Sequence, residues 1–310
     1  MVTFSDHVFA SIDKMPGEFD FINWIRSQQK PTKIVTHPAG DDLAILKWPE
    51  DELLLVGADQ VIDGVHFDST KHSPREIGRK AMNRNLSDCA AMACLPAAAV
   101  ATVALPRGAG VGYAKELYLG LREAADPFYC SIVGGDTASW DGKLILSVSI
   151  LGRSGGIAPV TRSGAKPGDG IFVTGPLGGS ILGRHLSFEP RIFLAREIAK
   201  KKRAHAMIDI SDGLSRDLAQ ICQMSNVGAS IDASLIPIHD DAVKLSKQNG
   251  RTPLEHALHD GEDHELLFTG PQPLPKEFVR IGEITDVKEI VLIQDGARRS
   301  LPSDGWEHRL

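Results

Sequence analysis

Two carboxylates and a hydroxyl group lie within four residues in the stretch Asp209-Ile210-Ser211-Asp212, which Gly213 follows. The stretch comes after an apolar run and before an amphipathic segment, so we expect it at a turn between a strand and a helix. Taken alone, it is most simply a helix cap, because the side-chain oxygen of Ser211 or Asp212 can accept a hydrogen bond from a free backbone N–H group. Other parts of the sequence favour a second interpretation, in which these oxygens bind a ligand.

The same arrangement recurs along the chain, where acidic side chains stand beside glycines or at the ends of predicted strands. These acids are Asp41, Asp42, Asp59, Asp63, Asp88, Asp136, Glu262 and Asp263. Carboxylate oxygens are hard ligands that suit Mg²⁺, which keeps several water molecules and shares its remaining positions with substrate phosphates. The pattern therefore indicates a magnesium site that handles phosphorylated substrates.

The composition favours a two-domain globular protein that does not have nucleic acid as its main partner. The chain has 310 residues, of which 42% are hydrophobic, and this length exceeds the usual size of a single core. The formal net charge is −6 and the pI is about 6.0, whereas binding to a phosphate backbone favours a basic face. The longest basic run, 200–203, is interpreted as the solvated end of a helix.

The four cysteines show no metal or redox motif. They are Cys89, Cys94, Cys130 and Cys222, and none forms a C-x-x-C pair. A reduced, cytoplasmic setting fits this usage. We expect no signal peptide, because acids occur early in the chain, and no membrane span, because no uncharged apolar run reaches about 18 residues.

Segments with helical and with strand patterns intermix in both halves, which predicts the α/β or α+β class. The expected helices are 18–28, 73–94, 112–125, 191–202, 214–224 and 240–248, and the expected strands are 43–46, 53–57, 97–104, 130–133, 144–151, 170–174, 206–210, 229–231, 265–269 and 278–284. Ser73, Pro74 and Glu76 form a capping-box pattern at the start of the second helix.

Two of the expected strands deliver acids to their ends, and one segment separates two domains. The strand 53–57 is expected to end before Asp59, and the strand 130–133 to end at Gly134-Gly135-Asp136. The segment 152–168 contains five glycines, two prolines and three basic residues, and it has no hydrophobic period. We therefore place the boundary there, with domains at 1–155 and 156–310.

Seven segments and the tail resemble the motifs of the thiamine-monophosphate kinase family, and they occur in that family's order. The segments are Gly40-Asp41-Asp42, 59–67 (DQVIDGVHF), Asn85-Leu86-Ser87-Asp88, Gly134-Gly135-Asp136-Thr137, 161–169 (TRSGAKPGD), 209–214 (DISDGL) and Gly261-Glu262-Asp263-His264-Glu265-Leu266, and the tail is Asp304-Gly305-Trp306-Glu307-His308. This family is part of the aminoimidazole ribonucleotide synthetase-like superfamily. The resemblance implies the two-domain fold of that superfamily, with an N-terminal domain that dimerises through a shared sheet or barrel and a C-terminal α+β domain.

The resemblance also implies an activity: ATP-dependent transfer of a phosphoryl group onto the phosphate of thiamine monophosphate, giving thiamine diphosphate, with nucleotide and metals in the cleft between the domains. The residues that match the family's Mg²⁺ ligands are Asp42, Asp59, Asp88, Asp136, Asp209 and Asp212. Those that match its nucleotide contacts are Arg162, Ser211, Tyr118 and Gly135. Those that match its thiamine monophosphate contacts are His66, Glu262 and Trp306.

The physical chemistry of such a transfer agrees with these residue types. Two polyanions must approach each other, and several Mg²⁺ ions bridging phosphate oxygens neutralise their charge and align them. Arg162 supplies a planar fork for a phosphate. The acceptor phosphate has a second pKa of about 6, so near pH 7 it is mostly a dianion and needs no proton removed. We therefore expect direct in-line transfer without a protein general base.

Each of these residues also has a simpler interpretation when it is taken alone. Asp88 is then a helix-surface acid, Arg162 a solvated loop charge, His66 a structural histidine and Trp306 a packing aromatic. Their joint occurrence favours the functional interpretation.

The chain departs from the family's pattern at several positions. Gly57 and Ala58 stand where the family usually has one or two hydroxyl residues, one of which can face a metal. Asn83-Arg84 replaces an apolar pair, and His264 replaces a tyrosine. Two alternatives therefore stay open: an enzyme of the same superfamily with a different acceptor, and a nucleotide-binding homologue that has lost catalysis.

The cysteines weaken two versions of the first alternative. Selenide-activating relatives carry a reactive residue in a glycine-rich N-terminal segment, and here no cysteine precedes Cys89. Relatives that mature hydrogenases end in a cysteine, whereas this sequence ends in His308-Arg309-Leu310.

Overall fold

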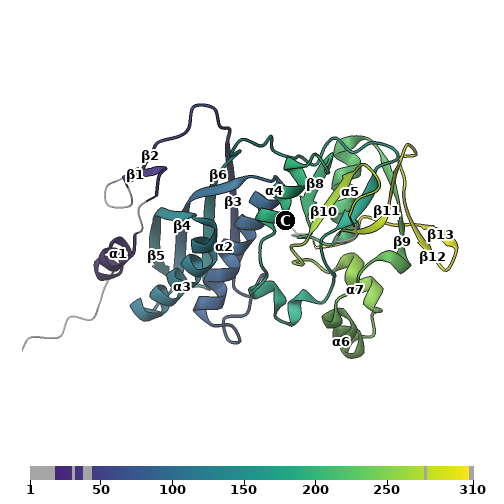
Figure 1. Ribbon diagram of the computed structural model, residues 1–310. Helices are drawn as coiled ribbons and strands as arrows, with labels where there is room; N and C mark the ends of the chain where they lie inside the picture. Colours follow the sequence, from purple (N-terminus) through teal and green to yellow (C-terminus); the bar gives the residue numbers. More distant parts are fainter. Residues whose placement is uncertain (1–17, 30–31, 38–43, 276–277, 307–310) are drawn as a thin grey trace, which may run out of the picture.

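The computed structural model describes residues 18–29, 32–37, 44–275 and 278–306 (Figure 1). The N-terminal half (blue and teal) contains a four-stranded sheet, and the C-terminal half (green and yellow) contains a seven-stranded sheet. Helices accompany both sheets, so the predicted mixed class is confirmed. Within the described ranges, none of the helices combines the length and the apolar character that a membrane span requires.

The N-terminal sheet has the strand order β3-β6-β4-β5. Its strands are β3 (Leu54–Ile62), β4 (Leu95–Pro106), β5 (Ser131–Trp140) and β6 (Ile145–Arg153). β6 pairs antiparallel with both β3 and β4, whereas β5 lies parallel to β4. Two short strands, β1 (Val35–His37) and β2 (Ile45–Leu46), form a separate antiparallel pair.

Two strands of this sheet are longer than the sequence predicts. The prediction that a strand ends before Asp59 is wrong, because β3 continues past it and stays paired with β6. The prediction that the next such strand ends at the glycine pair is also wrong, because β5 carries Gly135 and Asp136 in its middle. Gly135 is required at this point, since a Cβ atom there would lie 2.0 Å from the carbonyl oxygen of Ala101 on β4. Both acids thus project from paired strands.

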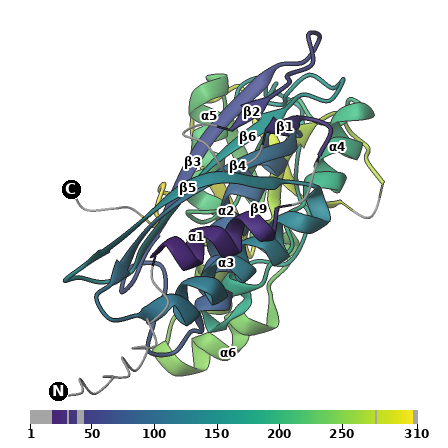
Figure 2. The ribbon, with the colours of Figure 1, turned by 90° about the vertical axis from the view of Figure 1, so that its left-hand side faces the viewer.

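Helix α2 (Pro74–Ala91) lies between the N-terminal sheet and the C-terminal half, where it contacts β3, β4 and β6 on one side and β8 and α4 on the other. It also packs on α3 (Gly110–Ala125). In the view of Figure 2 the strands of this sheet lie in front, with α1 (Glu18–Ser27, purple) beside them.

The start of α2 agrees with the prediction and its end does not. The predicted capping box is confirmed, because the Ser73 hydroxyl accepts from the Glu76 N–H group and the Glu76 carboxylate accepts from the Ser73 N–H group at 2.8 Å. The helix ends three residues earlier than predicted, since Ala93 has a left-handed φ of 53° and the Cys94 N–H group bonds to the Cys89 carbonyl oxygen.

The C-terminal sheet has the strand order β13-β12-β9-β11-β7-β10-β8, in which only β9 and β12 pair in parallel among the described strands. Its strands are β7 (Gly170–Val173), β8 (Ala206–Asp209), β9 (Gly228–Asp232), β10 (Leu266–Gly270), β11 (Val279–Thr285), β12 (Ile290–Gln294) and β13 (Ala297–Ser300). Its helices are α4 (Ile192–Lys200), α5 (Leu214–Ser225), α6 (Asp240–Asn249) and α7 (Pro253–His259). Single turns of 3₁₀ helix are η1 (Asp126–Phe128), η2 (Ser180–Leu182), η3 (Arg184–Leu186) and η4 (Ala233–Leu235).

One apolar core joins the two halves. Met82 of α2 and Leu117 of α3 belong to the same buried cluster as Ile192 of α4, Met207 of β8 and Phe268 of β10. A second cluster fills the C-terminal half alone. Because α2 is held by packing from both sides, its polar residues are positioned against the C-terminal half.

Candidate functional site

Three of the predicted metal-binding aspartates lie where the two halves meet. Asp59 is on β3, Asp88 is on α2, and the buried Asp209 ends β8. The Ser87 hydroxyl, next to Asp88, donates a 2.6 Å hydrogen bond to Oδ2 of Asp209 and so links the halves directly. Nδ1 of His264 lies 3.2 Å from the same oxygen.

Asp209 and Asp59 are close enough to Asp88 to alter its ionisation. Burial raises the pKa of Asp88 to about 8, and the charges of Asp209 and Asp59 contribute to the rise. Burial also opposes ionisation of Asp209, but the contacts with His264 and Ser87 and the charge of Arg162 together outweigh burial and lower the pKa of Asp209. Because the negative charges repel one another here, a cation among them would be stabilised, and the oxygen donors fit Mg²⁺.

A single chain does not bring all six predicted metal ligands together. Among the described residues, no three His, Cys, Asp or Glu side chains converge closely enough to hold an ion. Asp42 lies outside the described residues. Asp136 is exposed on β5, which β4 and β6 separate from β3, and three strand spacings amount to about 14 Å. Asp136 is therefore remote from Asp59 within its own chain.

Two cavities flank the aspartates. The first, of about 390 Å³, is lined on its polar side by Asp88, Arg162 and Asp209 and on its apolar side by residues such as Met92 and Met207. We call it the Arg162 cavity. It combines a guanidinium, two carboxylates and an apolar wall, which are the contacts that a phosphorylated compound with an apolar portion requires.

The second cavity, of about 490 Å³, is called here the Trp306 cavity. It brings together all three residues that match thiamine monophosphate contacts and two of the turn residues. Its lining includes the side chains of His66, Arg84, Ser211, Asp212, Glu262 and Trp306. The backbone N–H group of Trp306 donates a hydrogen bond to the Asp212 carbonyl oxygen at 2.9 Å, which connects the C-terminal tail to the turn.

The turn between β8 and α5 does not use Ser211 or Asp212 as a cap. Gly213, with φ 114°, precedes the helix and makes no side-chain cap bond. The carboxylate of Asp217 instead accepts from the N–H groups of Asp212 and Gly213, each at 3.1 Å. The helix-cap interpretation of this stretch is therefore wrong, and the turn residues line the Trp306 cavity.

Glu262 is held by two cations and a histidine. Nζ of Lys80, which is completely buried, lies 2.7 Å from its carboxylate, and Nη1 of Arg84 lies 3.2 Å from it. Nδ1 of His185 is 3.2 Å from Oε2. Burial opposes the charge of Glu262, but the contacts with His185 and Lys80 outweigh burial and lower its pKa strongly. Burial lowers the pKa of Lys80 to about 8, which leaves it charged at neutral pH.

Lys80 and Arg84 are residues that the motif-based prediction of the site missed. They lie one turn apart on α2, and Lys80 stands between the buried residues Ile77 and Ala81. A charged residue inside the apolar face of a helix is a signal that the sequence carries, because such a charge is rarely buried without a partner. The identity of the partner, Glu262, comes only from the fold.

His66 has a structural role and also lines the cavity. It is buried, and its Nδ1 accepts a hydrogen bond from the Ile62 N–H group at 3.1 Å. This contact requires that a neutral ring carry its proton on Nε2. His66 therefore makes a structural hydrogen bond, and it also lies beside the Trp306 cavity.

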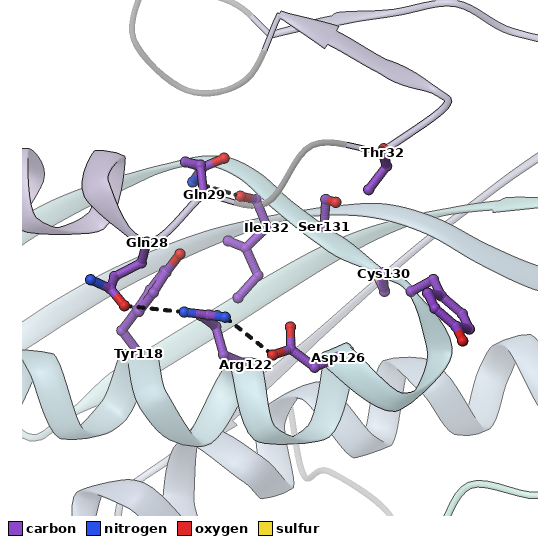
Figure 3. A pocket seen from close by; sticks show the side chains of 10 residues that line it. Gln28, Gln29, Thr32, Tyr118, Arg122, Asp126, Cys130, Ser131 and Ile132 are labelled. Atoms are coloured by element: carbon purple, nitrogen blue, oxygen red, sulfur yellow. Dashed lines mark hydrogen bonds and ion pairs between the residues drawn. The ribbon is translucent and has the colours of Figure 1, made fainter.

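Tyr118 and Gly135 do not line either of these two cavities. Tyr118 lies in a third cavity, of about 210 Å³, between α1, α3 and β5 (Figure 3). There Arg122 contacts Gln28 at 3.3 Å and Asp126 at 3.1 Å. Burial raises the pKa of Tyr118 to about 12. Within one chain, these two predicted nucleotide contacts are apart from Arg162 and Ser211.

Comparison with known proteins identifies the family. The protein-family model described as AIR synthase related protein, N-terminal domain, matches residues 40–154. The family model for the corresponding C-terminal domain matches residues 143–295. A thiamine-monophosphate kinase from Rhodopirellula baltica is 43% identical over 258 residues, which cover 81% of this chain and 81% of the relative. The chain belongs to the thiamine-monophosphate kinase family.

Two further relatives agree with this assignment. A thiamine-monophosphate kinase from Aquifex aeolicus is 32% identical over 312 residues, which cover 94% of this chain and 98% of the relative. A solved structure described as AaThiL complexed with AMPPCP and TMP is 30% identical, covers 97% of this chain and 100% of that one, and superposes with a TM-score of 0.76. The family resemblance, the fold of the superfamily and the prediction of an enzyme are confirmed.

Proposed function

We propose that this thiamine-monophosphate kinase family member transfers the terminal phosphoryl group of ATP to the phosphate of thiamine monophosphate, giving thiamine diphosphate. The observation that carries the proposal is that the turn 209–212 lines both cavities. Asp209 faces the Arg162 cavity, and Ser211 and Asp212 face the Trp306 cavity. A donor in one cavity and an acceptor in the other would meet beside the same carboxylates. The relatives' names and ligands supply the identity of the two substrates.

ATP is assigned to the Arg162 cavity and thiamine monophosphate to the Trp306 cavity. Arg162 offers a fork for the nucleotide phosphates, and Ser211 offers a hydroxyl at the junction of the cavities. Trp306 offers an aromatic face to the thiamine rings, and Glu262 offers a carboxylate whose position is already fixed.

The carboxylates at the junction are assigned to Mg²⁺. When bound by Asp59, Asp88, Asp209 and Asp212, Mg²⁺ ions would neutralise the charge of the two substrates and hold them in line. The raised pKa of Asp88 supports this assignment, because burial and neighbouring carboxylates disfavour its charged form until a cation offsets them. Ions that take water and phosphate oxygens as further ligands do not require a closed cage of side chains.

The transfer is assigned a direct in-line course with no protein general base. Near pH 7 the acceptor phosphate is mostly a dianion, since its second pKa is about 6. His66 is the one histidine among the predicted thiamine monophosphate contacts, and its Nδ1 is already occupied by the Ile62 N–H group. Nδ1 is therefore not available to take a proton from the acceptor, and the ring is assigned a positioning role.

A homodimer formed through the N-terminal sheet is part of the proposal. β3 is an edge strand, and on it Leu54 is 50% exposed and Val56 is 72% exposed. Apolar side chains along an unpaired edge favour pairing with another copy. β5 is the other edge strand, so a second copy gives Gly135 and Asp136 a route to a site that they do not reach in their own chain.

The domain division and the cellular setting complete the proposal. Residues 154–169 contain neither helix nor strand, which supports a boundary near residue 155. Cys89, Cys94, Cys130 and Cys222 are free and buried, which supports a reduced, cytoplasmic setting.

The test of the proposed function is a product assay. The purified protein is incubated with ATP, Mg²⁺ and thiamine monophosphate, and thiamine diphosphate is measured by chromatography. Formation of thiamine diphosphate that requires all three components is the expected result. ATP consumption only with a different acceptor would favour another enzyme of the superfamily, and nucleotide binding without turnover would favour a homologue that has lost catalysis.

A further inference from the structure

Arg84 is a cation placed among carboxylates at the inner wall of the Trp306 cavity. Its Nε lies 3.1 Å from Oδ2 of Asp59, and its Nη1 lies 3.2 Å from Oε1 of Glu262. The Arg84 side chain is 16% exposed and lines the cavity together with Trp306. It therefore joins the carboxylate on the side of β3 to the carboxylate on the acceptor side.

Only part of the guanidinium is used by these contacts. A guanidinium has five N–H groups in a planar fork. Of these, contacts within the described part of the chain use one on Nε and one on Nη1. The remaining N–H groups of Arg84 can donate to a ligand in the cavity that it lines.

The negative charges of both carboxylates that contact Arg84 are also compensated in other ways, so the guanidinium can turn toward a ligand. Glu262 keeps Lys80, whose Nζ contacts both of its carboxylate oxygens at 2.7 and 2.8 Å. The Asp59 side chain is 32% exposed and can be solvated or bind a cation. A phosphate that accepts from Arg84 therefore leaves neither carboxylate as an uncompensated buried charge.

We propose that Arg84 binds the phosphate group of the acceptor and thereby makes the Trp306 cavity selective for thiamine monophosphate over unphosphorylated thiamine. The inference rests on the proposed function, because it takes the acceptor from there. An Arg–phosphate contact is charge-assisted and can be bidentate, which fits a dianion entering a cavity whose wall is otherwise rich in carboxylates. The contact with Asp59 also places the guanidinium on the side where the donor phosphate must arrive.

Arg251 is the other arginine that lines this cavity, and its position fits the role less well. Its Nη1 pairs with Asp260 at 3.1 Å, its Nη2 bonds to the Glu255 carbonyl oxygen, and its side chain is 43% exposed. These contacts hold it at the end of α7, and none of them is with a predicted metal ligand.

The test compares the affinities of thiamine monophosphate and thiamine, measured by calorimetry without nucleotide and without Mg²⁺. Arg84→Met removes the charge and keeps the length, whereas Arg84→Lys keeps the charge and removes the fork. Arg79→Met is the matched control, because Arg79 is on the same helix but pairs with Glu123 away from the cavity.

The wild-type protein is expected to bind thiamine monophosphate more tightly than thiamine. Arg84→Met should weaken thiamine monophosphate binding by about tenfold to a hundredfold, the usual effect of losing a hydrogen bond between charged groups. Thiamine affinity should stay unchanged, which also shows that the variant is folded. Arg84→Lys should be intermediate, and Arg79→Met should keep the wild-type preference.

Two results would count against the inference in different ways. If Arg84→Met keeps the wild-type preference for the phosphorylated ligand, the inference alone is overturned. If the wild-type protein binds neither ligand, even when Mg²⁺ and nucleotide are added, the proposed acceptor is wrong and the inference falls with the proposed function.

Discussion

The carboxylate of Glu262 is fixed by contacts that exist before any substrate is bound. Its backbone is left-handed, with φ 63°, and Lys80, Arg84 and His185 all contact the side chain. Such a conformation is costly for a residue other than glycine and persists where the surroundings over-determine it. In the proposed function this ordered carboxylate would be a preorganised contact for the acceptor, because little side-chain entropy is left to lose on binding.

Trp306 is expected to serve the acceptor and not the nucleotide. Trp306→Ala should raise KM for thiamine monophosphate by about tenfold, since loss of an aromatic contact costs on the order of 1–2 kcal/mol. KM for ATP should change little, because Trp306 lines only one of the two cavities at the aspartates. Steady-state kinetics with each substrate varied in turn provides the measurement.

Trp140 offers a matched control for this substitution. It is 43% exposed, against 49% for Trp306, and lies on β5. Trp140→Ala should leave both KM values near the wild-type values. Equal rises in the two KM values of Trp306→Ala would instead mean that this tryptophan packs the tail.

His66 is expected to position the acceptor without taking its proton. The rate should rise with pH through about 6, as the acceptor phosphate becomes a dianion, and stay level toward about 8. His66→Asn should lower kcat/KM and keep this profile, because the wild-type Nδ1 is already an acceptor for the Ile62 N–H group. A pH–rate profile of both proteins checks this, and a rise near pH 7 that vanishes in the variant would make His66 a base.

At the scale of elements, α2 is the part that organises the site. Lys80, Arg84 and Asp88 occur at intervals of four residues and so lie along one face of this helix. α3 supports α2 at very close range. A Cβ atom on Gly78 of α2 would lie 2.1 Å from the Leu117 carbonyl oxygen, and one on Gly120 of α3 would lie 2.0 Å from the Arg75 carbonyl oxygen. The two glycines let the helix backbones meet.

Gly120→Ala should therefore separate the two helices and destabilise the protein. The added methyl group meets backbone, which cannot move away cheaply, so a loss of about 1–3 kcal/mol in the free energy of unfolding is expected. Gly112→Ala on the same helix is the control. No described atom lies within 4 Å of its added Cβ, so it should gain roughly 0.5–1 kcal/mol through helix propensity. Urea unfolding curves of both variants give the comparison, and equal stabilities would contradict the close packing.

Sequence reasoning succeeded for this helix where the signal was local. The capping box at Ser73 depends on two neighbouring side chains, and it is confirmed. Reasoning failed for β3 and β5, because Asp59 and Gly135 disfavour strands on their own and are held there by pairing with β6 and β4. Lys80 was missed for the same reason, since its partner is 182 residues away in the chain.

At the scale of the molecule, the two halves share one core and one junction of cavities. The cleft residues come from β3, α2, β8 and the loop before β10, so neither half could form the site alone. The edge strand β5 then raises a question of assembly, because Asp136 is exposed and remote from Asp59 in its own chain. In the proposed dimer, the Asp136 of one chain acts at the site of the other chain.

This arrangement predicts that two inactive variants restore each other. Asp136→Asn and Asp209→Asn should each be nearly inactive as homodimers. In a dimer with one chain of each kind, one site keeps Asp209 from the first chain and Asp136 from the second, while the other site loses both. Because about half of the randomly assembled twofold dimers are mixed and each has one intact site, coexpression should restore about a quarter of the wild-type activity.

The mixed dimers can be isolated with a different affinity tag on each chain, and thiamine diphosphate formation is then measured on the doubly purified sample. About half of the wild-type activity per dimer is expected there, since one of the two symmetry-related sites is complete. The same purification from cells that carry Asp209→Asn on both tags sets the background. If the mixed dimer is recovered and stays at that background, Asp136 acts within its own chain, and the sheet must bend or reorder to bring it to Asp59.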